Sequence, residues 1–169
     1  MALQDPKSIA WPLIFSYRGT ILGQGFVAEI NLQGRVLASP ESAGVWVYGV
    51  NPGAIAVSAP TLADTNVELR NTLTRLFIDF AQEAGTFDKF KRTVERFVEE
   101  SDPASEDEWR TARAAVKEGR VTGPSDLPKE TSDTPYTVQV TQKPIKDVTP
   151  QDNLLVQQES TPAIYDLAA

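Results

Sequence analysis

Hydrophobic and polar residues alternate in the early part of the chain, as they do in half-buried β-strands. Across 28–33 the alternation is strict (Ala-Glu-Ile-Asn-Leu-Gln), which places the apolar side chains on one side of a strand. The Gln33-Gly34 pair suits a turn, and the alternation resumes at Val36. The pattern therefore predicts a β-hairpin over 25–39.

Three shorter runs predict further strands. Residues 45–48 combine β-branched and aromatic side chains, which favour strands. Asn51-Pro52-Gly53 follows as a strong turn signal, because Pro fixes one backbone angle and Gly tolerates positive φ. We expect short strands at 14–17, 45–48 and 54–58.

A helical pattern begins after residue 60. Thr61 and Asp64 have the spacing of a capping box, in which the acid stands where Glu is more usual. Gly85 is a natural C-terminal cap. Between them, apolar residues recur at helical spacing on one face: Leu62, Leu69, Leu73, Leu76, Phe77 and Phe80.

Two more helices are expected before residue 120. The second begins near Thr86 and ends before Ser101. The third is indicated by a capping box over 105–108 and ends at Gly119. The apolar stripe of the second helix consists of Phe87, Phe90, Val94, Phe97 and Val98.

The remaining residues predict one strand between two less regular segments. The segment 120–135 is rich in Gly, Pro, Ser, Thr and Asp, which is typical of a linker or long loop. Residues 136–141 alternate again and predict a strand. We therefore expect an α+β core domain over 1–141, a small antiparallel β-sheet with helices packed on one face. An extended arm over 142–169 follows it, lying on its own domain or on a partner.

Composition narrows the chemistry that this chain can perform. Its 169 residues include no Cys and no His. This excludes Ser-His-Asp and Cys-His catalysis, zinc and iron–sulfur sites built from Cys or His, and disulfides. We expect a protein that is not an enzyme and has no catalytic residues, cofactor or bound metal.

The charge balance argues against two kinds of partner. Lys and Arg number 16 against 23 Asp and Glu, which gives a net charge of −7 at pH 7. Such an acidic surface disfavours direct binding to nucleic acid or to anionic membranes. No apolar stretch is long enough to span a membrane, and the first ten residues lack the apolar core of a secretion signal. We expect a cytoplasmic location.

Two clusters of charged residues suggest alternative chemistry. Glu29, Asp64 and Glu68 would have to converge to form a carboxylate metal site, as in a nuclease. Acids at a helix start are the ordinary expectation, however, because they suit the helix dipole. A basic stripe on the third helix would suit phosphate groups, but acids on the same helices weaken that interpretation: Arg110, Arg113, Lys117 and Arg120.

Candidate partner-binding residues lie in the arm and at two tryptophans. The arm holds more apolar residues than an inert tail would: Leu154, Leu155, Val156, Ile164, Tyr165 and Leu167. Trp11 and Trp109 are candidates for anchors in a pocket of a partner, because Trp is enriched among residues that dominate interface energy.

The stretch 51–77 contains a turn at Pro52-Gly53, followed by Thr61, Leu62 and Asp64 at the start of an amphipathic helix, and in this pattern it resembles the HicB-like antitoxin domain. A Pro-Gly turn, a short strand, and Thr-Leu followed by an acid that opens an amphipathic helix match the pattern of that family, while Thr65 stands where Ala is usual. The similarity extends over about 25–82. The chain departs from the family in two additional helices over about 87–118 and in the lack of a DNA-binding pattern after them. The matching positions are Pro52, Gly53, Thr61, Leu62 and Asp64.

The resemblance implies a non-catalytic protein that binds a partner, typically a small basic ribonuclease toxin, and masks it within a toxin–antitoxin system. An acidic surface suits such a partner through complementary charge. The alternative is a structural subunit of a multi-protein or phage assembly, in which the arm lies on a neighbour. A carboxylate-dependent metal nuclease is a third hypothesis. The chain is also a candidate for homo-oligomer formation.

Overall fold

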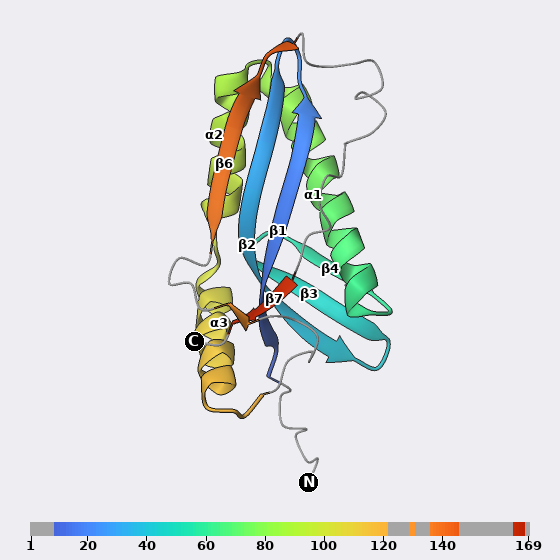
Figure 1. Cartoon of the computed structure of the whole chain (residues 1–169), viewed down its shortest axis with the longest axis vertical. Coiled ribbons are helices and arrows are strands. Elements are labelled where there is room, and N and C mark those ends of the chain that lie inside the picture. The colour runs from blue at the N-terminus through green and yellow to red at the C-terminus, as the bar shows by residue number, and fades with distance from the viewer. Residues whose placement is uncertain (1–8, 122–128, 131–135, 146–163, 168–169) are drawn as a thin grey trace.

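The computed structural model describes residues 9–121, 129–130, 136–145 and 164–167, and it confirms the predicted α+β fold. Within these ranges the chain forms one seven-stranded sheet and three helices (Figure 1). In chain order the elements are β1 (Trp11–Leu22), β2 (Val27–Glu41), β3 (Gly44–Asn51), β4 (Ala56–Ala59), α1 (Leu62–Ala84), α2 (Phe87–Glu99), α3 (Pro103–Lys117), β5 (Lys129–Glu130), β6 (Thr137–Lys143) and β7 (Ile164–Leu167).

The long strand β2 organises the sheet. On one edge it pairs antiparallel with the whole of β1. On its other edge β6 pairs with Val27–Gln33, and β3 pairs with Arg35–Glu41 after an irregularity at Arg35/Val36. Residues 137–143 therefore return to the sheet of their own chain, and β6 extends two residues into the range expected for the arm.

The predicted turn at Gln33-Gly34 is wrong, because β2 continues through it. Gly34 lies on β2 between the residues that pair with β6, which end at Gln33, and those that pair with β3, which begin at Arg35. A Cβ atom there would be 2.4 Å from the carbonyl oxygen of Asn51 and 2.4 Å from the ring of Phe15. Any side chain at position 34 would therefore clash with these two groups. Glycine inside strands is commonly found where neighbouring groups approach this closely.

One face of the sheet is covered by α1 and α2, which lie behind it in Figure 1. Alternate residues of β1 and β2 point at these helices and pack against the predicted apolar stripes. The most buried helix residues include Leu73, Phe77, Phe90 and Val94, each with no exposed surface. This cluster is the main hydrophobic core.

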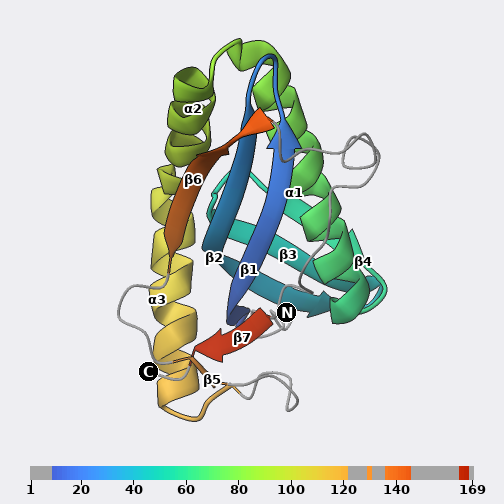
Figure 2. The ribbon, with the colours of Figure 1, turned by 45° about the horizontal axis from the view of Figure 1, so that its top comes forward.

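The third helix packs on the opposite face. Ile14, Leu37 and Val50 point away from α1 and form a second cluster with Trp109 and Ala112 of α3. Figure 2 shows α2 and α3 nearly in line along one side of the sheet. The lower part of the sheet is therefore buried on both faces, and α3 is an exception to the expected packing on one face.

Caps fix the helix boundaries. Thr61 accepts a hydrogen bond from the N–H of Asp64 at 3.1 Å, and Gly85 ends α1 with a φ of 70°. The start predicted for α3 at 105–108 is wrong. Asp102 caps this helix by accepting from the N–H of Ser105 at 3.2 Å, with Pro at the first helical position. None of the helices in the described ranges is long and apolar enough to cross a membrane.

Candidate functional site

Among the described residues, the edge of β1 that faces away from β2 is paired over only part of its length. β2 pairs with every residue of β1, whereas on the outer edge β7 pairs only with Leu13–Phe15. Within the described part of the chain, no strand lies beside the outer edge of Ser16–Leu22. The main-chain N–H and C=O groups of such an edge can pair with another extended chain.

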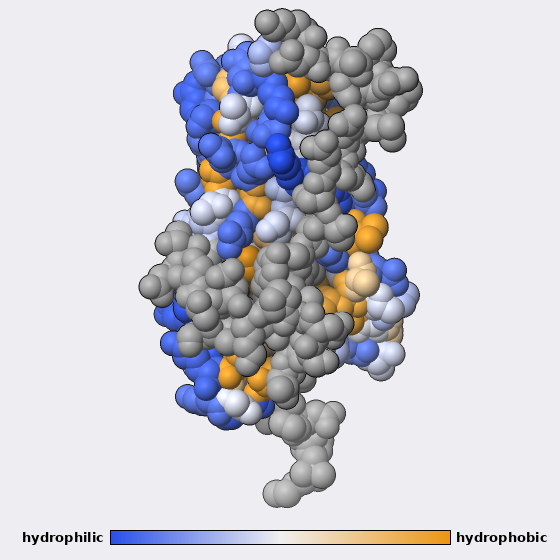
Figure 3. Space-filling view, in the orientation of Figure 1, coloured by the Kyte–Doolittle hydropathy of each residue, from blue (hydrophilic) through white to orange (hydrophobic). Residues whose placement is uncertain are grey.

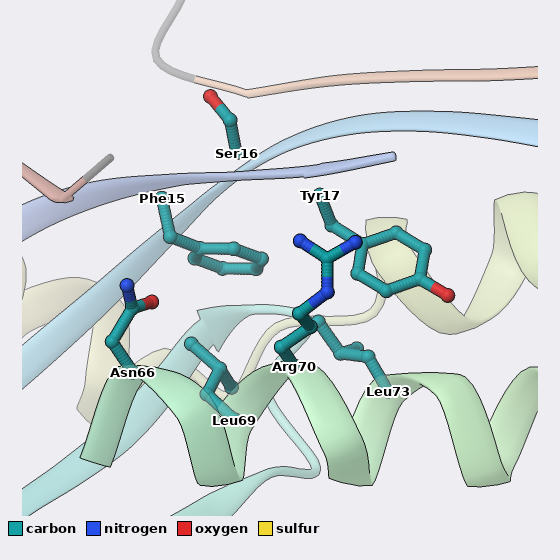
Figure 4. A pocket seen from close by; sticks show the side chains of 7 residues that line it. All are labelled: Phe15, Ser16, Tyr17, Asn66, Leu69, Arg70 and Leu73. Carbon is teal, nitrogen blue, oxygen red and sulfur yellow. The ribbon is translucent and has the colours of Figure 1, made fainter. Parts of the chain in front are cut away.

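A shallow hollow adjoins this edge, between β1 and α1 (Figure 4). It has almost no room for a water-sized molecule, so it is far smaller than the pockets of roughly 300–1,000 Å³ that hold small molecules. It is lined by Phe15, Ser16, Tyr17, Asn66, Leu69, Arg70 and Leu73.

Arg70 connects the β1 edge to α1. Its side chain is largely buried, and Nη2 donates to the carbonyl oxygen of Arg18 at 3.2 Å. In Figure 4 it extends from α1 toward Tyr17, and its guanidinium carbon lies 5.8 Å from the centre of that ring. Because the Arg18 carbonyl reaches a side chain of α1, it faces the outer edge. The N–H of the same residue, and those of every second residue along the strand, share this direction.

Tyr17 forms the wall of the hollow beside Arg70. Its hydroxyl shares a hydrogen bond with Oγ1 of Thr74 at 3.0 Å. Burial raises the pKa of Tyr17 above its usual value, against the smaller opposing effects of Thr74 and Arg70. The hydroxyl therefore stays protonated at neutral pH, and Tyr17 contributes packing and a fixed hydrogen bond to this edge.

The predicted arm residues fall partly within the described structure. Ile164, Tyr165 and Leu167 belong to β7, whose backbone pairs antiparallel with β1 and parallel with β5 of the same chain. Leu154, Leu155 and Val156 lie outside the described residues, as does most of the segment expected to be a linker.

The two candidate tryptophans have different surroundings. Trp11 begins β1 and is half-buried against the main core. Trp109 is 2% exposed and belongs to the second core, so the structure does not present it as an anchor for a partner. The sequence did not show that another part of the same chain covers Trp109.

Trp109 covers a buried polar network around Arg35. The Arg35 guanidinium lies 5.4 Å from the centres of both the Trp109 and Tyr136 rings. Nε donates to Oδ1 of Asn51 at 2.7 Å, and the guanidinium pairs with Glu106 of α3. Asn51 in turn donates to the carbonyl of residue 98, at the end of α2, at 3.0 Å. This network joins β2, β3, α2, α3 and the residue that precedes β6, which is a structural role.

The carboxylates considered for a metal site do not meet. Glu29 alternates with Ala28 and Ile30, which face α1, so it points to the opposite side of the sheet from Asp64 and Glu68. Asp64 bonds to the capping threonine of α1, and Glu68 pairs with Arg75 at 2.8 Å. Within the described ranges, no three Asp or Glu side chains are grouped to hold a metal ion.

Glu29 instead lies at the centre of an ion-pair cluster on the polar face of the upper sheet. Lys143 of β6 is 2.6 Å from Oε2, Arg18 of β1 is 3.3 Å from the same oxygen, and Asn31 donates to Oε1. The hydrogen bond from Lys143, supported by those from Arg18 and Asn31, lowers the pKa of Glu29 despite partial burial. Cations on the two neighbouring strands thus hold the carboxylate charged.

The lowered pKa predicts how acid affects stability. The contribution of Glu29 is fully present above its unfolded pKa and is lost as pH falls through its lower folded pKa. The difference in free energy of unfolding between the native chain and Glu29→Gln should therefore shrink between about pH 5 and pH 3. Urea unfolding at several pH values measures it. The exposed Glu68→Gln is the control, with a change within about 0.5 kcal/mol at each pH. A constant difference for Glu29→Gln down to pH 3 would contradict the prediction.

The basic stripe on α3 is partly neutralised by acids of the same region. Arg110 pairs with Asp107 at 3.2 Å, and Arg120 pairs with Glu118 at 2.6 Å. Arg113 is half-buried and Lys117 is exposed. Mixed charge at this surface weakens the case for phosphate binding, as the sequence suggested.

The sequence alone did not identify the outer edge of β1 as a candidate site. An alternating pattern identifies a strand but not which of its two edges is paired, because pairing depends on segments far away in the chain. Comparison of the chain with family models, with curated proteins and with solved structures found no match. The geometry of the surface is therefore the basis for assigning a function.

Proposed function

We propose that this protein is a non-catalytic interaction module that binds a partner protein and masks part of its surface, as HicB-like antitoxins do for small ribonuclease toxins. The observation that carries this proposal is the outer edge of β1. Over Ser16–Leu22 it offers main-chain groups without a strand partner in the described structure.

Strand addition is the binding mode that fits this edge. An extended segment of the partner forms main-chain hydrogen bonds with the outer edge of β1. The edge is already used in this way at its lower end, where β7 pairs with Leu13–Phe15. Arg70 and Tyr17 hold the strand against α1, so the edge is rigid before binding, which lowers the entropic cost of association.

Charge favours a basic partner. The net charge of −7 attracts a positively charged protein and speeds its encounter with the chain. A small basic ribonuclease, the partner that the family resemblance suggests, has this character. The acidic surface and the β1 edge then have separate roles, the first in encounter and the second in the bound complex.

A proline at Thr20 tests the binding mode. Thr20 follows Arg18 by two residues, so its N–H also faces the outer edge. Proline restricts the backbone angles of the residue before it, and Gly19 at that position tolerates the restriction. Thr20→Pro should keep the pairing with β2 and weaken partner capture by at least about tenfold, since it removes a main-chain donor and introduces bulk at the docking edge. The measurement is a tagged pull-down from the native host, followed by mass determination of the intact complex.

Thr20→Val is the matched control, because it retains the N–H and should capture the partner as the native chain does. Recovery of one small basic protein in fixed ratio, lost only with Thr20→Pro, would support the proposal. Equal capture by both variants would refute strand addition at this edge. Recovery of a large assembly would favour a structural subunit instead, and a native chain that captures nothing would count against an interaction module.

A further inference from the structure

Trp46 and Tyr48 form an aromatic pair at the surface of β3. Their ring centres are 6.0 Å apart and the rings are inclined by only 14°, so they are stacked. Tyr48 is 41% exposed, which makes it one of the few large hydrophobic residues at the described surface. Both side chains share the side of β3 that carries Val50, and that side faces away from α1.

This pair continues an apolar face that α3 covers only in part. Val50 is fully buried in the second core beneath α3, and Tyr48 lies directly opposite Leu37 of that core in the sheet register. On the other flank Trp46 and Tyr48 pair with Ser58 and Ala56 of β4, which are both exposed. Figure 3 shows hydrophobic and hydrophilic residues side by side at the surface over the β3–β4 end of the sheet. We call the side chains of Trp46, Tyr48, Ala56 and Ser58 the aromatic face.

The aromatic face lies in a segment without charge. From Ser42 to Ala63 the sequence contains no Asp, Glu, Lys or Arg, although the whole chain is 23% charged and carries −7. Strands at the surface of a monomeric protein usually carry charged side chains, and these charges prevent association with other chains. On this side of β3 and β4 such charges are lacking, and Glu41 at the end of β2 is a charged residue at the margin of the face.

We propose that the aromatic face binds a second copy of this chain in a two-fold symmetric dimer. Two copies of a chain with a charge of −7 repel each other, so they can approach closely only where neither carries charge. In a two-fold interface each patch meets its own equivalent, and an uncharged patch is therefore complementary to itself. Stacked Trp and Tyr rings at the centre provide large apolar contacts with little loss of side-chain entropy.

This dimer is independent of the β1 edge. β1 lies beyond β2 from β3 in the sheet order, and its hollow opens between β1 and α1, whereas the aromatic face points away from α1. A dimer formed through the aromatic face leaves the β1 edge available. The two proposals can thus fail separately.

Charge substitutions at Tyr48 test the dimer. Size-exclusion chromatography with light scattering should give twice the chain mass for the native protein. Tyr48→Glu should raise the dimer dissociation constant by at least about 30-fold, as expected for loss of a central aromatic contact. Val67→Glu is the control, because Val67 is 58% exposed on α1 and the substitution adds the same charge outside the aromatic face.

Tyr48→Lys separates local from overall electrostatics. It reduces the net negative charge yet still places like charges together across the two-fold axis, so it should also give a monomer. Far-UV circular dichroism checks that each variant is folded, and Tyr48→Ser serves if a charged variant is not. A native protein that stays monomeric at its highest soluble concentration would overturn the proposal. So would a dimer that persists in folded Tyr48→Glu, or one that Val67→Glu dissociates equally.

Discussion

Phe77→Ala should lower the free energy of unfolding by about 3–5 kcal/mol. Phe77 has no exposed surface, and its ring packs edge-on against Tyr17 at 5.4 Å and against Phe97 at 6.2 Å between ring centres. These contacts join β1, α1 and α2, so the cavity left by alanine cannot close by movement of one element. Chemical unfolding monitored by circular dichroism measures the loss.

Val67→Ala on the same helix is the control for Phe77→Ala. Val67 is 58% exposed, so its truncation should change stability by no more than about 0.5 kcal/mol. A loss below about 1 kcal/mol for Phe77→Ala would mean that the stripe of α1 is not buried against the sheet.

Arg35→Ala should destabilise the fold by a similar amount, about 3–5 kcal/mol. Arg35 is 8% exposed and is held by Asn51, Glu106, Trp109 and Tyr136. Its removal leaves the partly buried Glu106 carboxylate and the buried amide oxygen of Asn51 without their donor. It also removes a cation from between two aromatic rings. Unfolding by urea measures the change, and altered Trp fluorescence reports the loss of the contact at Trp109.

Two further substitutions distinguish the network from a single ion pair. Glu106→Gln retains an acceptor for Arg35 and should cost less, about 1–2 kcal/mol. Arg75→Ala removes an exposed arginine that is paired with Glu68 and should cost at most about 1 kcal/mol. If Arg35→Ala cost no more than Arg75→Ala, the network would not stabilise the junction of β2, β3 and α3.

The proposed partner site and the proposed dimer face rely on different properties of the sheet. The β1 edge offers main-chain groups beside a small hollow, whereas the aromatic face offers uncharged side chains. A chain that uses both would present two β1 edges per dimer to its partners. Intact-complex masses from the pull-down would then show two partner chains for two copies of this protein.

The order of strands and helices could be predicted from local patterns. The apolar stripes of α1 and α2 and the caps at Thr61 and Gly85 depend on residues within a few turns of one another, so periodicity identifies them. The same local reasoning misplaced the start of α3, because two capping sequences lie within a few residues and the structure uses Asp102. It also misread Gly34, whose role depends on Phe15 and Asn51 from other strands.

By itself, the sequence determined the fold class, the absence of Cys and His chemistry, the acidic charge and the faces of α1 and α2. Each of these follows from composition or from spacing within one segment. Only the tertiary structure decided that Trp109 is buried over Arg35, that Glu29 pairs with cations across three strands, that Ser16–Leu22 of β1 has no outer strand partner among the described residues, and that Trp46 and Tyr48 reach the surface. The physical reason is that burial, strand pairing and ion pairing depend on which segments, distant in the sequence, come into contact. A local pattern of residues carries no information about those contacts.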